Sequence, residues 1–203
     1  MKAFVTGFEP FGGERVNPSM EAVRRLPPRV GGLDIATGIL PTVFGLAAAR
    51  LEAALDEIAP DLVLCVGEAG GRAELSLERV AVNIEDARIA DNDGNRPIDR
   101  PVVAGGPAAY FATLPLKPAL AALTQQGLPA AVSQSAATFV CNSVFYSLMH
   151  RAAAQPACLR AGLLHVPYLP EQAAAHPGAP SMALCDIRRA VEIVLRVAAE
   201  DAG

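Results

Sequence analysis

Short apolar runs alternate along the chain with stretches in which apolar residues recur at every third or fourth position. The runs predict strands, and they occupy residues 2–8, 32–42, 61–67, 73–83, 128–138 and 158–170. The run at 61–67 is apolar throughout after its first residue, which is typical of a strand covered on both faces. Residues 73–83 alternate instead, so we expect Glu78, Val80 and Val82 to share one face of one strand.

The periodic stretches predict helices. Asn17 is placed to cap the first, and Pro18 follows it at a position where a missing N–H costs nothing. A second helix runs from Phe44, a third begins near Cys141, and Ser181 is expected to cap the last. The apolar stripes of these three helices are Phe44, Ala47, Ala48, Leu51, Leu55 and Ile58; Val144, Phe145, Leu148, Met149 and Ala152; and Leu184, Ile187, Val191, Val194, Leu195 and Ala198.

Strands that alternate with helices indicate a three-layer α/β/α fold with a mostly parallel, twisted central sheet. We expect residues 1–203 to form a single domain of this class. Ligands of such folds bind at the carboxyl ends of the strands. This rule marks the loops after Phe8, Gly67, Asn83, Thr138 and His165. Residues 85–114 are rich in Asp, Asn, Gly and Pro, and so long a loop predicts a functional segment or a partner surface.

Composition narrows the function classes. Charged residues make up 19% of the chain and the formal net charge is −4, so the basic field typical of nucleic-acid binding is missing. Apolar residues make up 52%, which argues against disorder. No apolar run approaches the roughly 18 residues of a membrane helix, and we expect no secretory signal after Lys2. These features together favour a cytoplasmic protein without nucleic-acid or membrane partners.

The four cysteines are scattered without a CxxC pair, so we expect no metal site. Cys141 falls in the first turn of a predicted helix, where free N–H groups and the helix dipole lower a thiol pKa and can stabilise an oxyanion. A free cysteine is also among the most often buried residues, so a packing role is the alternative. We interpret Cys65, Cys158 and Cys185 as packing thiols.

A catalytic thiol needs a base and a group that orients the base. His150 is expected to be solvated on the polar side of its helix, with Ser143, Ser147 and Arg151, and His176 to be exposed in a turn-rich loop. His165 differs, because it ends an apolar run at the sheet edge where Cys141 should also lie. Glu78 either pairs with Arg72, Arg79 or a backbone group, or accepts a hydrogen bond from His165 and fixes its tautomer.

The stretches VTGFEPFGGERVNPS, GEAGGRAELSLERVAVNIEDARIADNDG, TFVCNSVFYSLMH and GLLHVPYLPEQ resemble the pyroglutamyl peptidase type I family, also called pyrrolidone carboxyl peptidases. They occur in the family's order over most of the chain. The resemblance implies a cysteine peptidase that removes an N-terminal pyroglutamyl residue, often as a homotetramer and without a metal or organic cofactor. It also implies Cys141 as nucleophile, His165 as base and Glu78 as the orienting carboxylate.

The resemblance further implies a set of residues around the substrate's lactam ring. Phe8 and Phe11 match the family's pocket aromatics, Thr42, Ile89, Phe139 and Val140 match wall positions, and Asn17 and Glu68 match positions associated with lactam recognition. The chain departs from the family at Glu68, where Gln is common. A carboxylate there could accept a hydrogen bond from the lactam N–H but could not donate one to its carbonyl.

Two other functions are compatible with parts of the pattern. The stretch GFEPFGG could bind an anion in a phosphorylase-like α/β enzyme, although it lacks a P-loop lysine and the dinucleotide glycine pattern. A non-catalytic protein that binds pyroglutamyl peptides through the same pocket is the other alternative.

Overall fold

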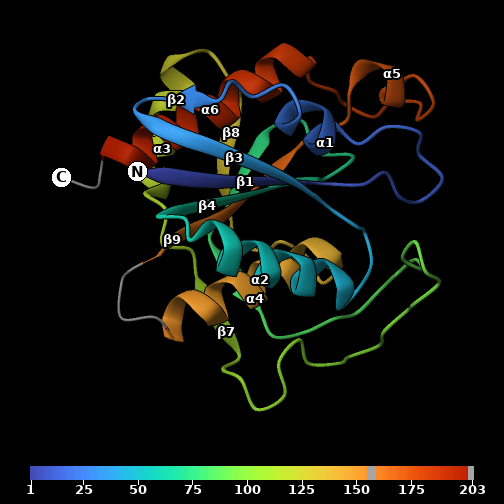
Figure 1. The fold of residues 1–203 in the computed structure, drawn as a ribbon. Helices are drawn as coiled ribbons and strands as arrows, with labels where there is room; N and C mark the ends of the chain where they lie inside the picture. The colour runs from blue at the N-terminus through green and yellow to red at the C-terminus, as the bar shows by residue number, and fades with distance from the viewer. Residues whose placement is uncertain (155–158, 201–203) are drawn as a thin grey trace.

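The computed structural model describes residues 1–154 and 159–200. Its centre is a seven-stranded sheet in the order β2-β3-β1-β4-β9-β5-β8 (Figure 1). The strands are β1 (Lys2–Phe8), β2 (Arg29–Val30), β3 (Leu33–Leu40), β4 (Leu62–Glu68), β5 (Leu75–Glu78), β8 (Ala130–Ser133) and β9 (Arg160–Val166). Four of the neighbouring pairs are parallel, and only β2–β3 and β5–β9 run antiparallel, which confirms the mostly parallel sheet.

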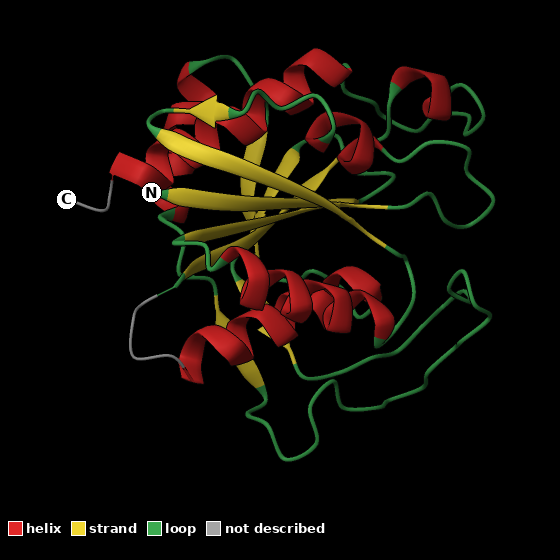
Figure 2. Cartoon of the chain, viewed as in Figure 1, coloured by secondary structure: helices red, strands yellow, loops and turns green. Residues whose placement is uncertain are grey.

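Helices cover both faces of this sheet. They are α1 (Pro18–Val23), α2 (Leu46–Ile58), α3 (Leu116–Gln125), α4 (Val140–Ala154), α5 (Pro170–Ala173) and α6 (Leu184–Glu200). In Figure 2, α2 and α4 lie below the strands, and α1, α3 and α6 lie above them. The expected α/β/α layering is therefore present. No helix in residues 1–154 and 159–200 combines the length and the apolar content needed to cross a bilayer.

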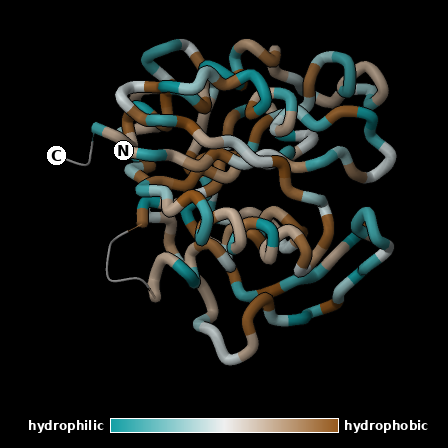
Figure 3. Tube along the Cα trace, viewed as in Figure 1, coloured by the Kyte–Doolittle hydropathy of each residue, from teal (hydrophilic) through white to brown (hydrophobic). Residues whose placement is uncertain are grey.

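Two apolar cores flank the sheet, and β4 contributes to both. Leu62, Leu64 and Val66 join the core under α1, α3 and α6, whereas Val63 and Cys65 join the core under α2 and α4. Figure 3 shows the hydrophobic residues concentrated in the strands and in the helices that face them. Full burial of such a side chain is worth about 1.5–3 kcal/mol. Burial on both faces explains why the sequence of β4 is continuously apolar.

The sequence located α1 correctly and missed α3. Asn17 is the N-cap of α1, where its side chain accepts a hydrogen bond from the Ser19 N–H, and Pro18 is the first helical residue. The sequence pattern predicts no element between residues 115 and 127, although α3 occupies most of this segment. Pro118 lies in the first turn of α3, where the missing N–H is tolerated.

Residues 73–83 do not form one strand. β5 ends at Glu78 in the main sheet, and β6 (Val80–Val82) pairs with β7 (Ala109–Phe111) in a separate ribbon. The prediction that Glu78, Val80 and Val82 share one strand face is therefore wrong. The N–H of Arg79 donates to the Ser133 carbonyl on β8, and the chain then leaves the main sheet. β5 is buried at every position, whereas in β6 only Ala81 is buried.

The predicted cap of α6 is also wrong. The helix begins at Leu184, and the Ala183 carbonyl accepts hydrogen bonds from the N–H groups of Asp186 and Ile187. Ser181 instead forms an isolated bridge with Tyr168. The predicted stripe of α6 is buried except for half-buried Leu184. A favourable capping residue three positions upstream cannot compete when a tertiary contact fixes its backbone elsewhere.

Residues 83–108 connect β6 to β7 as a long loop pinned by buried polar groups. The Asp91 carboxylate accepts hydrogen bonds from the backbone N–H groups of Phe44 and Asn95. Glu85 accepts from the Ser143 hydroxyl at 2.6 Å and from Arg100, so the loop is tied to α4. Ser143, predicted on the polar side of its helix, is buried. A partner surface on this loop stays a prediction.

Candidate active site

Three chemically reactive side chains come together from separate elements. Cys141 is the second residue of α4, His165 lies near the end of β9, and Glu78 is the last residue of β5. The Nδ1 atom of His165 lies 2.8 Å from Oε1 of Glu78. β5 and β9 are neighbouring strands, so the sheet itself holds the carboxylate beside the imidazole.

Gly67 on β4 allows the sulfur and the imidazole to approach each other. A Cβ atom at this position would lie 2.9 Å from Cys141 Sγ and 3.1 Å from His165 Nε2. The two atoms are therefore no farther apart than the sum of these distances. A real side chain would push at least one of them away, since contacts under 3.0 Å do not occur around real Cβ atoms. The absence of a side chain at Gly67 therefore leaves the space in which the Cys141 thiol and the His165 imidazole lie near each other.

Cys141 lines a pocket although it is only 8% exposed, so its sulfur is not sealed in the core. Burial raises the pKa of its thiol to about 12, with further increases from the charge of Glu68 and from Cys65 and Glu78, against a smaller lowering by its own backbone N–H. The expected lowering of the pKa by the helix start is therefore wrong, because desolvation is the larger effect. The thiol rests protonated, which favours proton transfer to His165 during attack over a standing ion pair.

Glu78 is fully buried and binds two partners through one oxygen. Its Oε1 accepts a hydrogen bond from Arg72 Nη1 at 2.6 Å in addition to the contact with His165. Burial raises the pKa of the carboxyl, but the hydrogen bond and charge of His165, the neighbouring Ser133 hydroxyl and the hydrogen bond from Arg72 lower it overall. The two alternatives for Glu78, a partner of Arg72 and a partner of His165, occur together.

The pocket beside Cys141 has a volume of about 310 Å³, at the lower end of the usual size for small-molecule sites. Phe139 contacts Phe11 with ring centroids 5.7 Å apart and Phe44 at 5.2 Å. The lining residues are Phe11, Glu68, Ala69, Gly70, Arg72, Asp86, Arg88, Ile89, Ala136, Ala137, Thr138, Phe139, Cys141 and His165. Six of the predicted site residues are in this set, and no specific signal in the sequence marks Ala136 or Ala137.

Four predicted substrate-binding residues lie outside the described pocket lining. Phe8 and Val140 are buried in the core, at 1% and 0% exposure. The Asn17 amide and the Thr42 hydroxyl both donate hydrogen bonds to the Glu9 carbonyl. The assignment of these four residues to substrate binding stays a prediction. Asn17 and Thr42 hold the start of the loop that carries Phe11.

Glu68 lines the pocket, and no arginine or lysine of the described residues forms an ion pair with it. Its Oε2 accepts a hydrogen bond from Gln172 Nε2 at 2.9 Å, and the same amide nitrogen lies 3.4 Å from Glu14 Oε2 and 3.3 Å from the Val16 carbonyl. Burial raises the pKa of Glu68 to about 7, with the Gln172 hydrogen bond opposing the rise. A protonated Glu68 can both donate and accept, which the carboxylate cannot.

The other two histidines are held by neighbours away from Cys141. His150 Nδ1 lies 2.8 Å from the Tyr110 hydroxyl, and the ring is half-buried rather than solvated as predicted. His176 Nε2 lies 2.6 Å from Glu14 Oε1 and stacks on Tyr168, so it is half-buried rather than freely exposed. Neither histidine lines the pocket that contains Cys141.

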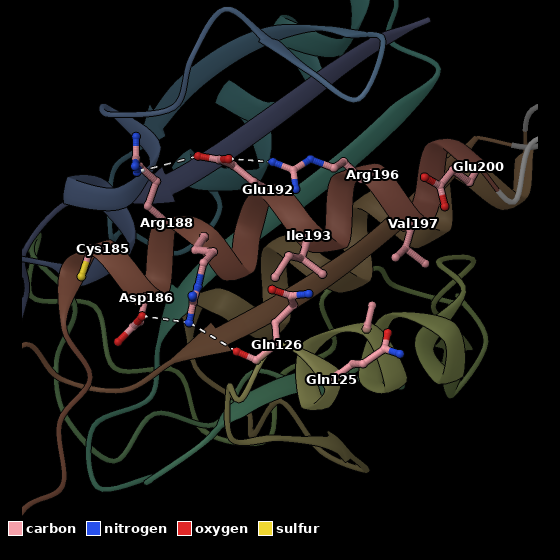
Figure 4. Close-up of a pocket in the computed structure, with 12 residues that line it drawn as sticks. Gln125, Gln126, Cys185, Asp186, Arg188, Glu192, Ile193, Arg196, Val197 and Glu200 are labelled. Atoms are coloured by element: carbon pink, nitrogen blue, oxygen red, sulfur yellow. Dashed lines mark hydrogen bonds and ion pairs between the residues drawn. The ribbon is translucent and has the colours of Figure 1, made fainter.

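A larger hollow of about 660 Å³ lies between α3 and α6 (Figure 4). Its charged side chains neutralise one another: Glu192 pairs with Arg188 and Arg196, and Asp186 pairs with Arg189. Cys185 lines this hollow and is exposed, so the prediction that it packs in the core is wrong, whereas Cys65 is fully buried as predicted. The prediction for Cys158 falls outside the described residues. Among the described residues, no histidine lines this hollow.

Comparisons with known proteins agree with the geometry. The sequence model of the family described as Pyroglutamyl peptidase, Peptidase_C15, matches residues 1–201. The pyrrolidone-carboxylate peptidase of Erwinia tasmaniensis is 54% identical over 97% of this chain and 92% of that protein. The pyrrolidone-carboxylate peptidase 1 of Ralstonia nicotianae is 56% identical over 95% of this chain and 92% of that protein.

Solved structures show the same likeness in three dimensions. The crystal structure of Bacillus amyloliquefaciens pyroglutamyl peptidase I superposes with a TM-score of 0.94 at 45% identity, covering 98% of this chain and 97% of that one. A mutant pyrrolidone carboxyl peptidase from Pyrococcus furiosus superposes with a TM-score of 0.97 at 42% identity, covering 100% of both chains. With a family match over nearly its whole length and relatives above half identity, this chain belongs to the pyroglutamyl peptidase family.

Proposed function

We propose that Cys141, His165 and Glu78 form the catalytic triad with which this chain hydrolyses the bond after an N-terminal pyroglutamyl residue. The activity is that of a cysteine-type pyroglutamyl peptidase, which releases pyroglutamate from peptides. The observation that carries the triad is that Cys141 Sγ and His165 Nε2 lie 2.9 Å and 3.1 Å from the position that a Cβ on Gly67 would take. On the other side of the imidazole, Nδ1 lies within hydrogen-bond distance of Glu78.

The geometry supports a two-step acyl transfer. His165 Nε2 takes the thiol proton as Sγ attacks the pyroglutamyl carbonyl, and Glu78 stabilises the imidazolium through Nδ1. We infer that the N–H of Cys141, at the start of α4, and the backbone at Arg88, a residue that lines the pocket, stabilise the oxyanion. His165 then protonates the leaving amine as the C–N bond breaks. Water, deprotonated by His165, hydrolyses the thioester and releases pyroglutamate.

The pocket suits an uncharged five-membered lactam. Phe11, Ile89 and Phe139 give it apolar walls, and Glu68 supplies a hydrogen-bonding group. In its protonated form Glu68 can donate to the lactam carbonyl, so replacement of the more common Gln preserves a donor near neutral pH. A free N-terminal ammonium would lose its hydration among these apolar walls, and pairing it with Glu68 would require that buried carboxyl to ionise, which favours the cyclised residue.

The test is hydrolysis of a chromogenic pyroglutamyl amide by Cys141→Ala and Cys141→Ser. We expect kcat/KM to fall by about 10³-fold or more, because the covalent step is lost. Cys185→Ala is the matched control, since it removes a thiol at the same helical position from outside the pocket. Near-parent hydrolysis by both Cys141 variants would refute the nucleophile. Calorimetric binding of a pyroglutamyl peptide that the parent does not hydrolyse would instead support the binding-protein alternative.

The family resemblance also supports three proposals about the whole protein. We propose that residues 1–203 form one catalytic domain, that the domain assembles as a homotetramer, and that it acts in the cytoplasm. The match of the family model over residues 1–201 supports the first of these. Size-exclusion chromatography with light scattering tests the tetramer, and a mass of 21.1 kDa throughout would contradict it.

A further inference from the structure

A second cation reaches the triad through its carboxylate. Arg72 follows β4 in the loop that leads to β5, and its guanidinium lies at the wall of the pocket with its side chain 32% exposed. Nη1 donates to Glu78 Oε1 at 2.6 Å, and Nη2 donates to the Ser135 carbonyl at 3.2 Å. Arg72 therefore bridges the end of β5 and the segment that leads into the helix of Cys141.

The hydrogen bonds at Glu78 are distributed unequally. Oε1 accepts from both Arg72 and His165, whereas Oε2 has no hydrogen-bond partner in the part of the chain that the structure describes. The Ser133 hydroxyl, opposite Glu78 in the β5–β8 register, donates to the Ser135 carbonyl instead. The contact with Arg72 therefore fixes which carboxylate oxygen faces the imidazole.

We propose that Arg72 is a positioning residue for the reaction, because its guanidinium holds Glu78 as an ionised acceptor for His165 Nδ1–H and so leaves Nε2 free to take the thiol proton. The inference rests on the proposed triad. Without Arg72, the fully buried carboxylate would face a neutral imidazole with no fixed cation. Such a carboxylate tends to take up a proton, and a protonated Glu78 could donate to Nδ1 and place the imidazole proton on Nε2. That tautomer cannot act as the base toward Cys141.

The other charged and titratable groups around this cluster do not replace Arg72. Cys141 on α4 and Glu68 on β4 line the same pocket, but neither side chain can carry a positive charge. Ser133 on β8 is uncharged. Arg88 lines the pocket without a hydrogen bond to Glu78. Among the described residues, Arg72 is the cation that the contacts assign to the triad carboxylate.

The test compares Arg72→Met, which removes the charge, with Arg72→Lys, which retains it. For Arg72→Met we expect kcat to fall about 10–100-fold with KM within about threefold, and the pH profile of kcat/KM to shift. Arg72→Lys should recover most of kcat. Arg100→Met is the matched control, because Arg100 also pairs with a buried glutamate, Glu85, and its loss should leave the pH profile in place.

Several outcomes would overturn the proposal. The first is a kcat and a pH profile in Arg72→Met that match the parent. The second is a rise in KM alone, which would indicate that Arg72 binds substrate directly. The third is a loss of kcat with an unchanged pH profile that Arg72→Lys does not recover. If Arg72→Met is unfolded by circular dichroism, Arg72→Gln provides the same comparison, since it keeps a donor and loses the charge. Cys141→Ser is assayed in parallel: hydrolysis by that variant refutes the triad itself, whereas its inactivity beside a parent-like Arg72→Met refutes only the role of Arg72.

Discussion

Two cysteines of this chain occupy the same position in a helix. Cys141 is the second residue of α4 and Cys185 is the second residue of α6, so both lie among the free N–H groups of a first turn. Cys141 is 8% exposed and meets His165 above Gly67. Cys185 is exposed beside paired charged side chains (Figure 4).

The difference lies in what each helix start faces. α4 begins beside the carboxyl ends of β4 and β9, where Gly67 and His165 are hydrogen-bonded strand neighbours. α6 begins on the outer surface beside α3, where Arg189 reaches Asp186 and the Gln126 carbonyl. The helix dipole is common to both sites, so it cannot be what makes one of them reactive. The neighbouring strand ends supply the base, and removing them from Cys141 should make it resemble Cys185.

Loss of the base should have the largest effect. We expect His165→Ala to lower kcat/KM for a pyroglutamyl amide by about 10³-fold or more, because the thiol, whose pKa burial raises to about 12, keeps its proton. Steady-state kinetics measures this. His150→Ala is the control for loss of a half-buried histidine, and it should stay within a few-fold of the parent. A His165→Ala variant that retains a tenth of the parent rate would place the base elsewhere.

A side chain at Gly67 should separate the two reacting groups. We expect Gly67→Ala to lower kcat about 100-fold, because its Cβ would occupy the space within 2.9 Å of both Sγ and the imidazole Cδ2. Gly162→Ala crowds Leu114 from the neighbouring strand β9 and serves as the control for strand crowding. Thermal melts should show a loss of stability in both variants. Only in Gly67→Ala should the loss of kcat be larger than the loss of stability explains. Equal kinetic losses in the two variants would contradict the role of Gly67.

Glu68 should make the active site sensitive to pH. Its pKa is raised from 4.5 to about 7 in the folded state, so folding binds a proton between these values and stability falls as pH rises through that window. Glu68→Gln removes this dependence, which is worth on the order of 3 kcal/mol. It should also extend activity to higher pH, because an ionised Glu68 opposes the thiolate of Cys141. Urea unfolding from pH 5 to pH 9 measures the free energy of unfolding against pH. If that free energy depends on pH in Glu68→Gln as it does in the parent, the first effect is contradicted.

The turn into α4 is strained and the turn into α6 is not. Ala137 has a φ of 58°, and among the described residues 179–183 before α6 there is no such conformation outside glycine. We expect Ala137→Gly to stabilise the fold by about 0.5–1 kcal/mol, offset in part by the greater flexibility of the unfolded chain. Denaturant titration measures the change. A destabilised variant would mean that the Ala137 methyl packs usefully in the pocket wall.

Cys185 should have the smallest effect. Cys185→Ser is expected to stay within about twofold of the parent in kcat/KM, because the residue lies outside the pocket of Cys141. Iodoacetamide should still inactivate Cys185→Ser, with mass spectrometry locating the modification at Cys141. Inactivation that disappears with Cys185 would reverse the comparison.

Local sequence patterns were enough to predict elements that depend on short apolar runs, helical spacing or a capping residue. β1 at residues 2–8, the Asn17 cap and the start of α4 near Cys141 follow from a few neighbouring residues each. The same rules misplaced the cap of α6, because Tyr168 fixes Ser181 in a bridge. They also joined β5 to β6, because the change of sheet after Glu78 depends on strand partners that are distant in the sequence.

The sequence by itself determined the α/β alternation, the likeness to a peptidase family, and the residues Cys141, His165 and Glu78 as candidates. Only the tertiary structure decided that burial raises the pKa of the Cys141 thiol, that Arg72 shares Glu78 with His165, and that Asn17 and Thr42 both bind the Glu9 carbonyl. The physical reason is the separation along the sequence of the residues that interact. Periodicity and capping report free energies between residues a few positions apart, whereas desolvation and ion pairing depend on groups brought together from distant strands.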